Sequence, residues 1–572
     1  MSIPRPEYPR PDLTRESFLN LNGKWEFEIE KGAAKRQDKF LKKGSLAGEI
    51  TVPFAPESKL SGVEHLDFMK SVWYRRTFTL PEDWKSGKTI LHFGAVDYMA
   101  EVWVNGQPAG THRGGYTPFS FDITGLLREG ENIITLNARD DTKNPLIPTG
   151  KQSTKRANYG CVYTRCTGIW QTVWLEQVPD LHIKKVKLTP DVDNSCLHIE
   201  ADLSGYGGGE ILRAAASLEG KEVAKTEIKI TGDYARGVLP VKDAQLWSPS
   251  SPVLYDLTLT VGLDSVSSYF GMRKVELDGF AIKLNGKPLY QRLILDQQYY
   301  PDGIYTAPTD GDLKGDIELS LAAGFNGARM HMKIFEPRFL YWADRLGYLL
   351  WAEYPNWGLR DSDEAAMYAM LPEWVESMQR DYNHPSVVGW CPFNETPVNR
   401  LAHLFESVYE VTKAIDPTRP VIDTSGYTHS AKTDIYDVHD YEQDPKLFKE
   451  RYDHLLDGTP NNEIYVNHPG HEQYDGKLSY FVSEFGGIHW NVDGGELGWG
   501  YGEAPKSLEE FYTRYEGLVK VLLENPKMSA FCYTQLTDVQ QEKNGLYTFA
   551  RKKKFDLERI RKANEQIAAI EK

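Results

Sequence analysis

The sequence predicts two β-sandwiches followed by a (β/α)8 barrel, and three observations support that fold class. The chain has 572 residues, which is too long for a single hydrophobic core. Alternating strand patterns dominate up to about residue 273, whereas helix and strand patterns alternate beyond it. Two apolar, strand-like runs in the last part end in Glu395 and Glu484, as is typical where the parallel strands of a barrel end.

The first domain is expected at residues 1–180. Residues 72–80 alternate loosely between apolar and polar side chains, as a half-buried strand does. Asn105 and Gly106 follow another such run, and both tolerate the positive φ angles of a tight hairpin. Strands at this spacing, with hardly any helical period, predict a sandwich whose last strand lies at residues 168–175.

The second domain is expected at residues 181–273. Short alternating strands such as residues 185–188 and 254–261 recur there, and the segment has the size of an immunoglobulin-like β-sandwich. No combination of residues with catalytic potential is visible in it. We therefore assign no site to this domain.

The third domain is expected at residues 274–572. Leu313, Ile317 and Leu321 share one face of a helix, and a strand-like stretch follows each such helical pattern, as at residues 348–353. A (β/α)8 barrel, or TIM barrel, requires this alternation of helix and strand.

Composition restricts the partners and the location of the protein. The net charge is 66 − 81 = −15 without a run of like charge, which argues against nucleic acid. The aromatic content of 12% suits sugar stacking and sandwich cores equally well. The N-terminus has no apolar signal region and no run could span a bilayer, so we expect a soluble, cytoplasmic protein without a membrane partner. A signal peptide removed earlier would leave the same start.

The cysteines do not form a recognisable framework. Their odd number and the absence of CxxC spacing argue against a disulfide scaffold and against a zinc site. A Cys161–Cys166 pair is the alternative to free thiols, which we favour. No cluster has metal-ligand spacing, so we predict no metal and no cofactor, while a structural Mg²⁺ or Na⁺ ion is left open.

The two glutamates predict a hydrolase site. Two carboxylates that face each other across the mouth of a barrel can cleave a glycosidic bond, with retention at a separation of about 5–5.5 Å and inversion at about 6.5–9.5 Å. Asn394 directly precedes Glu395, and an amide there can hold a sugar hydroxyl whose hydrogen bond strengthens in the transition state. For Glu395 or Glu484 alone, a buried ion pair with Arg or Lys is the alternative interpretation.

The chain resembles glycoside hydrolase family 2, the family of β-galactosidases, β-glucuronidases and β-mannosidases, over essentially its whole length. Residues 381–395 are similar to the acid/base signature of that family, and residues 483–486 to its nucleophile segment. The resemblance to its sugar-binding sandwich, which implies a jelly-roll-like N-terminal domain, is carried by residues 21–25, 102–106, 114–116 and 168–173.

The resemblance implies a retaining mechanism. Glu484 would attack the anomeric carbon, while Glu395 would protonate the leaving oxygen and later deprotonate water. For the first of these steps, burial or the charge of Glu484 has to keep Glu395 protonated.

Three further positions are compared with the family pattern. Arg329 would favour the ionised nucleophile, with a plain structural ion pair as the alternative. His331 is a sugar ligand or a core histidine, because the family pattern is shifted by one residue here. Glu353 matches an acidic position of the third strand, although Ala352 stands where an Asp often precedes it.

Four more residues are candidates for the substrate site. His439 and Tyr441 lie where a sixth strand should end, and the tyrosine would donate a hydrogen bond to the nucleophile or pack as an aromatic. Asp296 falls in a first strand that departs from the family pattern, and we interpret it as a sugar ligand of this chain. Trp357 would form the floor of a subsite, or part of the core.

Departures from the family pattern surround the substrate's own sugar. Thr534 occupies the place of a stacking tryptophan, and residues 541–545 lack the Asn-Lys signature that holds a uronate. We therefore expect an exo-acting glycosidase for a neutral sugar, first of all a β-galactosidase, with an oligosaccharide or glycoside as partner. An α-L-arabinofuranosidase, or another furanosidase or pentosidase, and an inactive carbohydrate-binding protein are the alternatives. A homo-oligomer is left open.

Overall fold

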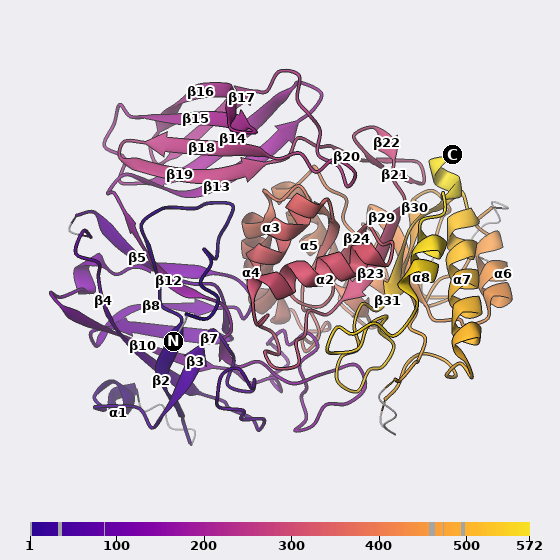
Figure 1. The fold of residues 1–572 in the computed structure, drawn as a ribbon, viewed down its shortest axis with the longest axis horizontal. Coiled ribbons are helices and arrows are strands. Elements are labelled where there is room, and N and C mark those ends of the chain that lie inside the picture. The colour runs from indigo at the N-terminus through magenta and orange to yellow at the C-terminus, as the bar shows by residue number, and fades with distance from the viewer. Residues whose placement is uncertain (1–2, 32–36, 85, 457–463, 473, 493–497) are drawn as a thin grey trace.

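The computed structural model describes most of the chain in three domains (Figure 1). The described residues are 3–31, 37–84, 86–456, 464–472, 474–492 and 498–572.

The N-terminal domain is a β-sandwich. One sheet has the order β1-β12-β5-β9, the other β3-β2-β4-β10-β7-β8, and β6 and β11 form a short ladder. Side chains alternate between the two faces of a strand, so Trp25 and Phe27 of β2 both point into the core. The elements are β1 (Phe18–Asn20), β2 (Gly23–Ile29), α1 (Gln37–Leu41), β3 (Gly48–Val52), β4 (Val72–Thr79), β5 (Lys88–Phe93), β6 (Val96–Asp97), β7 (Met99–Val104), β8 (Gln107–Arg113), β9 (Phe119–Asp122), η1 (Thr124–Leu126), β10 (Glu131–Arg139), β11 (Gly168–Ile169) and β12 (Val173–Val178).

The second domain lies above the first in Figure 1 and is also built of antiparallel strands. Its ladder has the order β13-β14-β17-β16-β15-β18-β19 and encloses an aliphatic core of its own. The strands are β13 (His182–Asp191), β14 (Cys196–Ser204), β15 (Ile211–Leu218), β16 (Lys221–Thr231), β17 (Tyr234–Pro240), β18 (Tyr255–Val261) and β19 (Asp264–Phe270).

A three-stranded sheet of β20 (Val275–Asp278), β21 (Ala281–Leu284) and β22 (Lys287–Pro288) leads into the third domain. Ile282 and Leu284 pack in one cluster with side chains from the barrel strands. Ser479, the first residue of the strand β30, donates a 2.9 Å hydrogen bond to the carbonyl of Phe280. This sheet therefore covers the end of the barrel at which the strands begin.

The third domain is a barrel of parallel strands surrounded by helices, which confirms the predicted fold class. Seven strands form one sheet in the order β26-β25-β24-β23-β31-β30-β29. The elements are β23 (Gln291–Asp296), α2 (Asp310–Ala322), β24 (Gly327–Met330), α3 (Pro337–Leu346), β25 (Leu349–Glu353), α4 (Ala366–Asp381), β26 (Val387–Cys391), β27 (Asn394–Thr396), α5 (Ala402–Ile415), β28 (Ser425–Tyr427), β29 (Ile435–Asp440), α6 (Pro445–Asp453), β30 (Ser479–Gly486), α7 (Leu508–Glu524), β31 (Met528–Thr534), α8 (Leu557–Asn564) and η2 (Ala569–Glu571).

The segment 420–427 occupies the place of the remaining strand. The amide of Trp390 donates to the carbonyl of Pro420, and the amide of Ile422 donates back to Trp390. Farther along, Asn394 in β27 pairs with Ser425 in β28 in parallel register. These contacts connect β26 to the far edge of the sheet, so the barrel is closed.

The helices begin and end at residues with suitable capping chemistry. Thr309 and Asp312 form a capping box at the start of α2, in which each side chain accepts a hydrogen bond from the other's backbone. Gly347 ends α3 in the left-handed region at φ 71°, where glycine has no steric penalty. Leu313 and Ile317 of α2 are buried, as their helical spacing predicts.

One strand differs from its expected length. The sequence suggests a continuous run through Asn394 and Glu395, but β26 ends at Cys391 and the separate short strand β27 begins at Asn394. Pro392 lies between them and has no amide hydrogen for the ladder. Glu395 itself adopts a positive φ of 51°, which is uncommon for a residue other than glycine.

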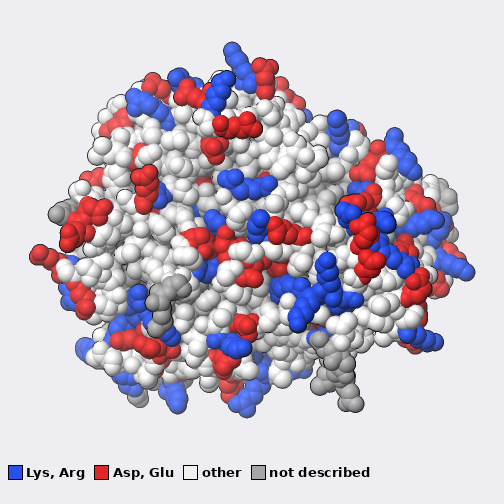
Figure 2. Space-filling model, in the orientation of Figure 1, with Lys and Arg blue, Asp and Glu red and all other residues white. Residues whose placement is uncertain are grey.

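Three simpler features concern the cysteines, the helices and the surface charges. All five cysteines are free, and Cys161 is only half-buried whereas the other four are buried. Among the described residues, none of the helices combines the length and the apolar character needed to cross a bilayer. Basic and acidic side chains are interspersed over the face drawn in Figure 2.

Candidate active site

Glu395 and Glu484 meet at the carboxyl end of the barrel strands. Glu395 lies in β27, directly after the fourth strand, and Glu484 lies near the end of β30. One carboxylate oxygen of each, together with one ring nitrogen of His439, forms a group whose atoms all lie within 4.8 Å of one another. Two acidic groups from distant parts of the sequence therefore face the same small space.

His439, in β29, lies between the two carboxylates. Its Nδ1 atom is 2.9 Å from Glu395 Oε1 and 3.4 Å from Glu484 Oε2. Burial by itself would lower the pKa of His439, but the charges of Glu484 and Glu395 outweigh burial and raise it. The imidazolium form is thus favoured, and its charge reduces the repulsion between the two acids.

Arg329, at the end of β24, connects three strand ends. Its Nη1 atom donates to Glu484 Oε1 at 3.1 Å and to the carbonyl of Ser483 at 2.7 Å. Its Nη2 atom donates to Asn394 Oδ1 at 3.0 Å, and its Nε atom forms a 2.6 Å ion pair with Glu353. Because the guanidinium group is planar, these contacts fix Glu484, Asn394 and Glu353 relative to one another.

Two further side chains surround Glu484. Tyr441 follows β29 and donates a short hydrogen bond from its hydroxyl to Glu484 Oε2. The ring of Tyr441 stacks on Tyr501 with a centroid distance of 3.3 Å, which restricts its rotation. His331 is held by Glu353, at 3.0 Å from its Nδ1 atom, and the same nitrogen lies 4.0 Å from Glu484.

The surroundings of Glu484 strongly favour its ionised form. Burial alone would raise the pKa of this carboxyl, but the positive charges of His439, Arg329 and Lys151 outweigh burial and lower it to about 2. Glu484 is therefore an anion at neutral pH, which is the state that a nucleophilic carboxylate requires.

Asn394 is fixed through its backbone and leaves an amide group free. Its amide nitrogen donates to Asn356 Oδ1 at 2.9 Å, and its carbonyl accepts from Trp357 Nε1 at 3.2 Å. The side-chain Oδ1 is used by Arg329, but the buried Nδ2 group has no hydrogen-bond partner in the described part of the chain. An unsatisfied buried donor at this position is suited to a ligand oxygen.

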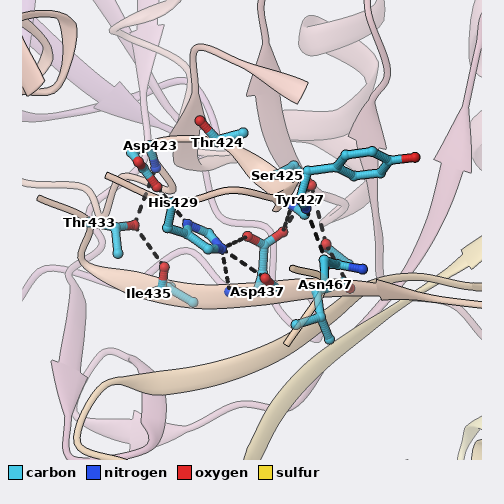
Figure 3. A network of polar contacts seen from close by, with 12 residues as sticks. Asp423, Thr424, Ser425, Tyr427, His429, Thr433, Ile435, Asp437 and Asn467 are labelled. Carbon is cyan, nitrogen blue, oxygen red and sulfur yellow. Dashed lines mark hydrogen bonds and ion pairs between the residues drawn. The ribbon is translucent and has the colours of Figure 1, made fainter. Parts of the chain in front are cut away.

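A second polar network surrounds His429 and Asp437 (Figure 3). The Ser425 hydroxyl donates to Asp437 Oδ2 at 2.9 Å and lies 3.0 Å from His439 Nε2. His429 lies between Asp423, at 2.7 Å from its Nδ1 atom, and Asp437, at 3.2 Å from its Nε2 atom. Because Ser425 gives its only proton to Asp437, its oxygen accepts from His439 Nε2–H, which fixes the protonation of that nitrogen.

Most of the residues predicted from sequence come together here. Those in direct contact with one another are Glu395, Glu484, Asn394, Arg329, His331, Glu353, His439, Tyr441 and Trp357. Asp296 does not join them: its Oδ1 atom accepts from the amide of Gln298 at 2.8 Å. Burial and the neighbouring Asp316 raise the pKa of Asp296 to about 7, so it belongs to a separate buried acidic pair.

Several residues of the site were not identified from sequence. Ser425, Asp437 and Asn356 act on His439 or Asn394 from neighbouring loops and strands, and Lys151 belongs to the N-terminal domain. Asn356 could have been found because it directly precedes Trp357. The others carry no local signal, since only the closure of the barrel and the docking of the domains bring them here.

Two groups of side chains have the donor atoms of a metal site, as far as the described residues show. One is Glu395, His439 and Glu484, and the other is Asp191, Cys196 and His198 in the second domain. In the first group a single nitrogen of His439 faces both carboxylates, so a proton on that nitrogen already serves as the shared positive charge. The expectation of no metal and no cofactor stays a prediction.

A barrel whose strand ends carry two carboxylates within one small space defines the class of O-glycosyl hydrolases. Models of glycosyl hydrolases family 2 match the chain in three successive parts. The sugar-binding domain model covers residues 18–146, the second model residues 181–273 and the TIM barrel domain model residues 281–453. The chain belongs to glycoside hydrolase family 2 and is a glycosidase.

Curated relatives differ in the sugar named. The chain is 25% identical to a β-glucuronidase of Paenibacillus borealis over 72% of this chain and 74% of the relative. It is 28% identical to a β-galactosidase of Thermoanaerobacter pseudethanolicus over 62% of this chain, and it spans only 48% of that relative. The names therefore support glycoside hydrolysis and leave the sugar unassigned.

Solved structures agree in fold over nearly the full length. A β-glucuronidase of Bifidobacterium dentium covers 97% of this chain and 98% of its own, with a TM-score of 0.82 and 20% identity. A family 2 β-galacturonidase of Eisenbergiella tayi covers 99% and 98%, with a TM-score of 0.75 and 19% identity. At these identities the likeness concerns the fold alone.

Proposed function

We propose that this protein is an exo-acting, retaining glycosidase that releases a neutral sugar from the non-reducing end of a glycoside. Glu484 is the nucleophile and Glu395 is the acid/base residue. The observation that carries the proposal is the proximity of the two carboxylates, with oxygens within 4.8 Å of each other. That spacing supports direct attack, because inversion needs about 6.5–9.5 Å to admit a water between the two groups.

In the first step a Glu484 oxygen bonds to the anomeric carbon as the glycosidic C–O bond breaks. Glu395 gives its proton to the leaving oxygen, so the aglycone departs as a neutral alcohol. In the second step Glu395, now a carboxylate, removes a proton from water, and the resulting hydroxide displaces Glu484 from the sugar. Two inversions at the anomeric carbon give net retention.

The side chains around Glu484 support this division of roles. Arg329, Tyr441 and His439 all contact its carboxylate, keeping it ionised and oriented before attack. The free Nδ2 group of Asn394 is suited to a hydroxyl of the sugar, next to the anomeric carbon on which Glu395 and Glu484 converge. Each contact would change as charge leaves Glu484, which is where transition-state stabilisation arises.

A β-galactoside is the first choice for the sugar. In place of a uronate-binding signature, the loop after β31 carries Glu542, which is buried and would repel a sugar carboxylate. An α-L-arabinofuranoside is the second choice, because Thr534 in place of a stacking tryptophan suits a smaller ring. Relatives named β-glucuronidase make the uronide the competing substrate to be tested.

A panel of 4-nitrophenyl glycosides followed by chemical rescue tests the proposal. We expect hydrolysis of a neutral glycoside by the wild type, and loss of about 10⁴-fold or more in kcat for Glu484→Gly. Azide should restore turnover of that variant and yield a glycosyl azide of inverted anomeric configuration, detectable by NMR. Glu565→Gly, at an exposed position, is the control and should keep wild-type activity.

Two outcomes contradict the proposal. Cleavage of the uronide alone would remove the assignment of a neutral sugar. Full activity of Glu484→Gly, or release of the anomer opposite to the substrate by the wild type, would remove the nucleophile and the retaining mechanism.

A further inference from the structure

A segment of the N-terminal domain, residues 149–165, lies against the site in the barrel. At one end the amide of Thr149 donates to the carbonyl of Trp357 at 2.7 Å, and Gly150 donates to Pro355 at 3.2 Å. A Cβ atom at Gly150 would lie 2.5 Å from the Met332 carbonyl, so the close approach requires glycine. The first domain is thus in contact with the loop that holds Asn394.

The other end of this segment contacts the loop after β31. Gln541 Nε2 donates to the carbonyls of Gly160 and Val162, at 2.8 and 3.0 Å. The hydroxyl of Tyr163 donates a short hydrogen bond to Glu542 Oε2. Segment 149–165 therefore bridges two loops at the carboxyl end of the barrel.

Lys151 is the notable side chain of this segment. It is 6% exposed, and its ammonium lies 4.0 Å from the ring centroid of Trp357, whose Nε1 atom donates to the carbonyl of Asn394. Within the described chain, no protein atom accepts a hydrogen bond from this ammonium and no carboxylate forms an ion pair with it. The ammonium donors of this largely buried side chain are therefore available to a ligand.

Glu542 is the buried acidic counterpart of the cationic Lys151. It is 2% exposed, and its two oxygens accept from the Tyr163 hydroxyl and from Asn544 Nδ2, which are both neutral donors. The amide of Tyr163 also donates to the carbonyl of Lys151 at 2.7 Å, so Lys151 and Glu542 are connected through one residue. A buried acid and a buried base thus lie close together without direct contact.

We propose that Lys151 and Glu542 are the residues that select a neutral, polyhydroxylated sugar, with neighbouring sugar hydroxyls bound between them. This inference rests on the proposed function and names two of its binding residues. A hydroxyl can accept from the ammonium and donate to the carboxylate at the same time. A sugar carboxylate can only accept, so at this place it would face Glu542 with like charge.

The electrostatics of Lys151 agree with this geometry, whereas burial raises the pKa of Glu542. Burial by itself would lower the pKa of Lys151, but the Cys161 thiol and the carboxylates of Glu395, Glu542 and Glu484 outweigh burial and raise it. Lys151 is thus charged at neutral pH and lies within electrostatic range of both members of the carboxylate pair. Lys151, from the first domain, also contributes to lowering the pKa of Glu484.

Lys151→Met and Glu542→Gln test the proposal with three substrates, the 4-nitrophenyl β-galactoside, α-L-arabinofuranoside and β-glucuronide. Methionine keeps an unbranched stem over Trp357 and removes the charge. For Lys151→Met we expect KM for the neutral glycoside to rise tenfold or more, with a smaller change in kcat. For Glu542→Gln we expect the ratio of kcat/KM for the uronide to that for the neutral glycoside to rise at least tenfold.

Lys155→Met is the matched control. Lys155 lies in the same segment and over an aromatic ring, Tyr159, at 3.9 Å, but it is exposed. We expect wild-type constants for this variant. A thermal melt of each protein, and titration with the free monosaccharide by calorimetry, separate lost binding from lost folding.

The outcomes are distinct from those of the nucleophile test. If Lys151→Met melts and binds the monosaccharide like Lys155→Met, the inference is wrong even where azide rescues Glu484→Gly. If the wild type cleaves only the uronide and Lys151→Met abolishes that cleavage, Lys151 binds a carboxylate and the selection of a neutral sugar is overturned.

Discussion

His439 has a central position at the scale of single residues. Its two ring nitrogens have separate partners: Nδ1 faces the carboxylate pair Glu395 and Glu484, and Nε2 faces Ser425. Asp437 accepts the hydrogen bond that the Ser425 hydroxyl donates. The Ser425 oxygen is therefore left to accept a hydrogen bond from His439. Ser425 and Asp437 therefore set the protonation of His439, which lies beside both carboxylates.

We predict that Ser425→Ala lowers kcat/KM by about 10- to 100-fold, because it leaves His439 Nε2–H without its acceptor in a buried place. Steady-state kinetics on the best neutral glycoside measure the change. Ser407→Ala on the exposed face of α5 is the control and should be silent. Unchanged kinetics for Ser425→Ala would show that the network does not position His439.

The pH dependence of catalysis gives a second prediction, which concerns the influence of His439 on Glu484. Burial raises the pKa of Glu484, and His439 is the largest influence that lowers it, with a net value of about 2. Protonation of Glu484 disables the nucleophile, so this group is ionised throughout the range of about pH 4–8 used for assays. In His439→Phe the pKa of Glu484 should rise.

We therefore expect the acidic limb of the profile of kcat/KM against pH to move to higher pH in His439→Phe. A profile for the wild type and the variant, on a substrate with a dinitrophenyl leaving group that needs little acid assistance, isolates this effect. A variant whose acidic limb does not move would contradict the proposed electrostatic role of His439.

At the scale of elements, β26 shows how tightly the barrel strands are packed. A Cβ atom on Gly389 would lie 2.3 Å from the ring of Trp351 in the neighbouring strand β25. Trp351 is 1% exposed and donates from Nε1 to Gln291 Oε1 at 2.7 Å, so the ring cannot move away easily. The glycine is thus required by packing and not by backbone angle.

We predict that Gly389→Ala lowers the free energy of unfolding by about 1–3 kcal/mol, the usual range for overpacking a core. Thermal unfolding followed by circular dichroism measures the loss. Gly315→Ala in α2 is the matched control, because a Cβ there meets no atom within 4 Å and alanine favours a helix by about 1 kcal/mol. Equal melting temperatures for the two variants would contradict the packing argument.

At the scale of the whole molecule, the N-terminal stretch connects the two sandwiches. Arg15 forms ion pairs of 2.9 Å with Glu176 in β12 of the first domain and with Asp264 in β19 of the second. All three side chains are buried. Burial by itself raises the pKa of Glu176, but Arg10, His92 and Arg15 outweigh it and hold the pKa far below its usual range.

We predict that Arg15→Met lowers the free energy of unfolding by about 3–5 kcal/mol at neutral pH, because it removes the arginine that pairs with buried Asp264 and leaves buried Glu176 with Arg10. Arg213→Met, which breaks an exposed ion pair with Glu227, should cost under 1 kcal/mol. The first transition of urea-induced unfolding measures the free-energy change of each variant. Similar losses for the two variants would mean that Arg15 does not connect the domains.

The sign of the pH effect follows from the lowered pKa of Glu176. Its contribution to stability is fully present above the unfolded pKa of about 4.3 and is lost as the pH falls toward the folded pKa. The difference between wild type and Arg15→Met should therefore hold from about pH 7 to about pH 5 and shrink as unfolding is repeated from about pH 4 down to about pH 2. A difference that grows on acidification would contradict this assignment.

Periodicity in the sequence was sufficient for the fold class and for much of the site. Parallel strands end at one edge of a barrel, so a polar residue at a strand end has a predictable place even when its neighbours in space are far away in the chain. Glu395, Glu484 and His439 were predicted in this way, whereas Arg329 and Glu353 were predicted from the family resemblance. The predicted family and glycosidase class are confirmed. The break in the strand before Asn394 was missed, although Pro392 marks it.

Side-chain direction was harder to predict. Asp296 ends the first barrel strand, so its position suggested a sugar ligand. Its Oδ1 atom accepts from the amide of Gln298, and within the described chain no hydrogen bond joins its carboxyl to Glu395 or Glu484. One strand end offers more than one direction for a side chain, and packing decides among them.

The sequence by itself determined the order of strands and helices and the two glutamates at strand ends, because both depend on local pattern. Only the tertiary structure brought Lys151 to Trp357, Glu542 to Tyr163 and Ser425 to His439. The contacts of Lys151 and Glu542 join segments that are hundreds of residues apart in the chain, and Ser425 and His439 belong to different strands. No local preference of the chain encodes contacts of this kind.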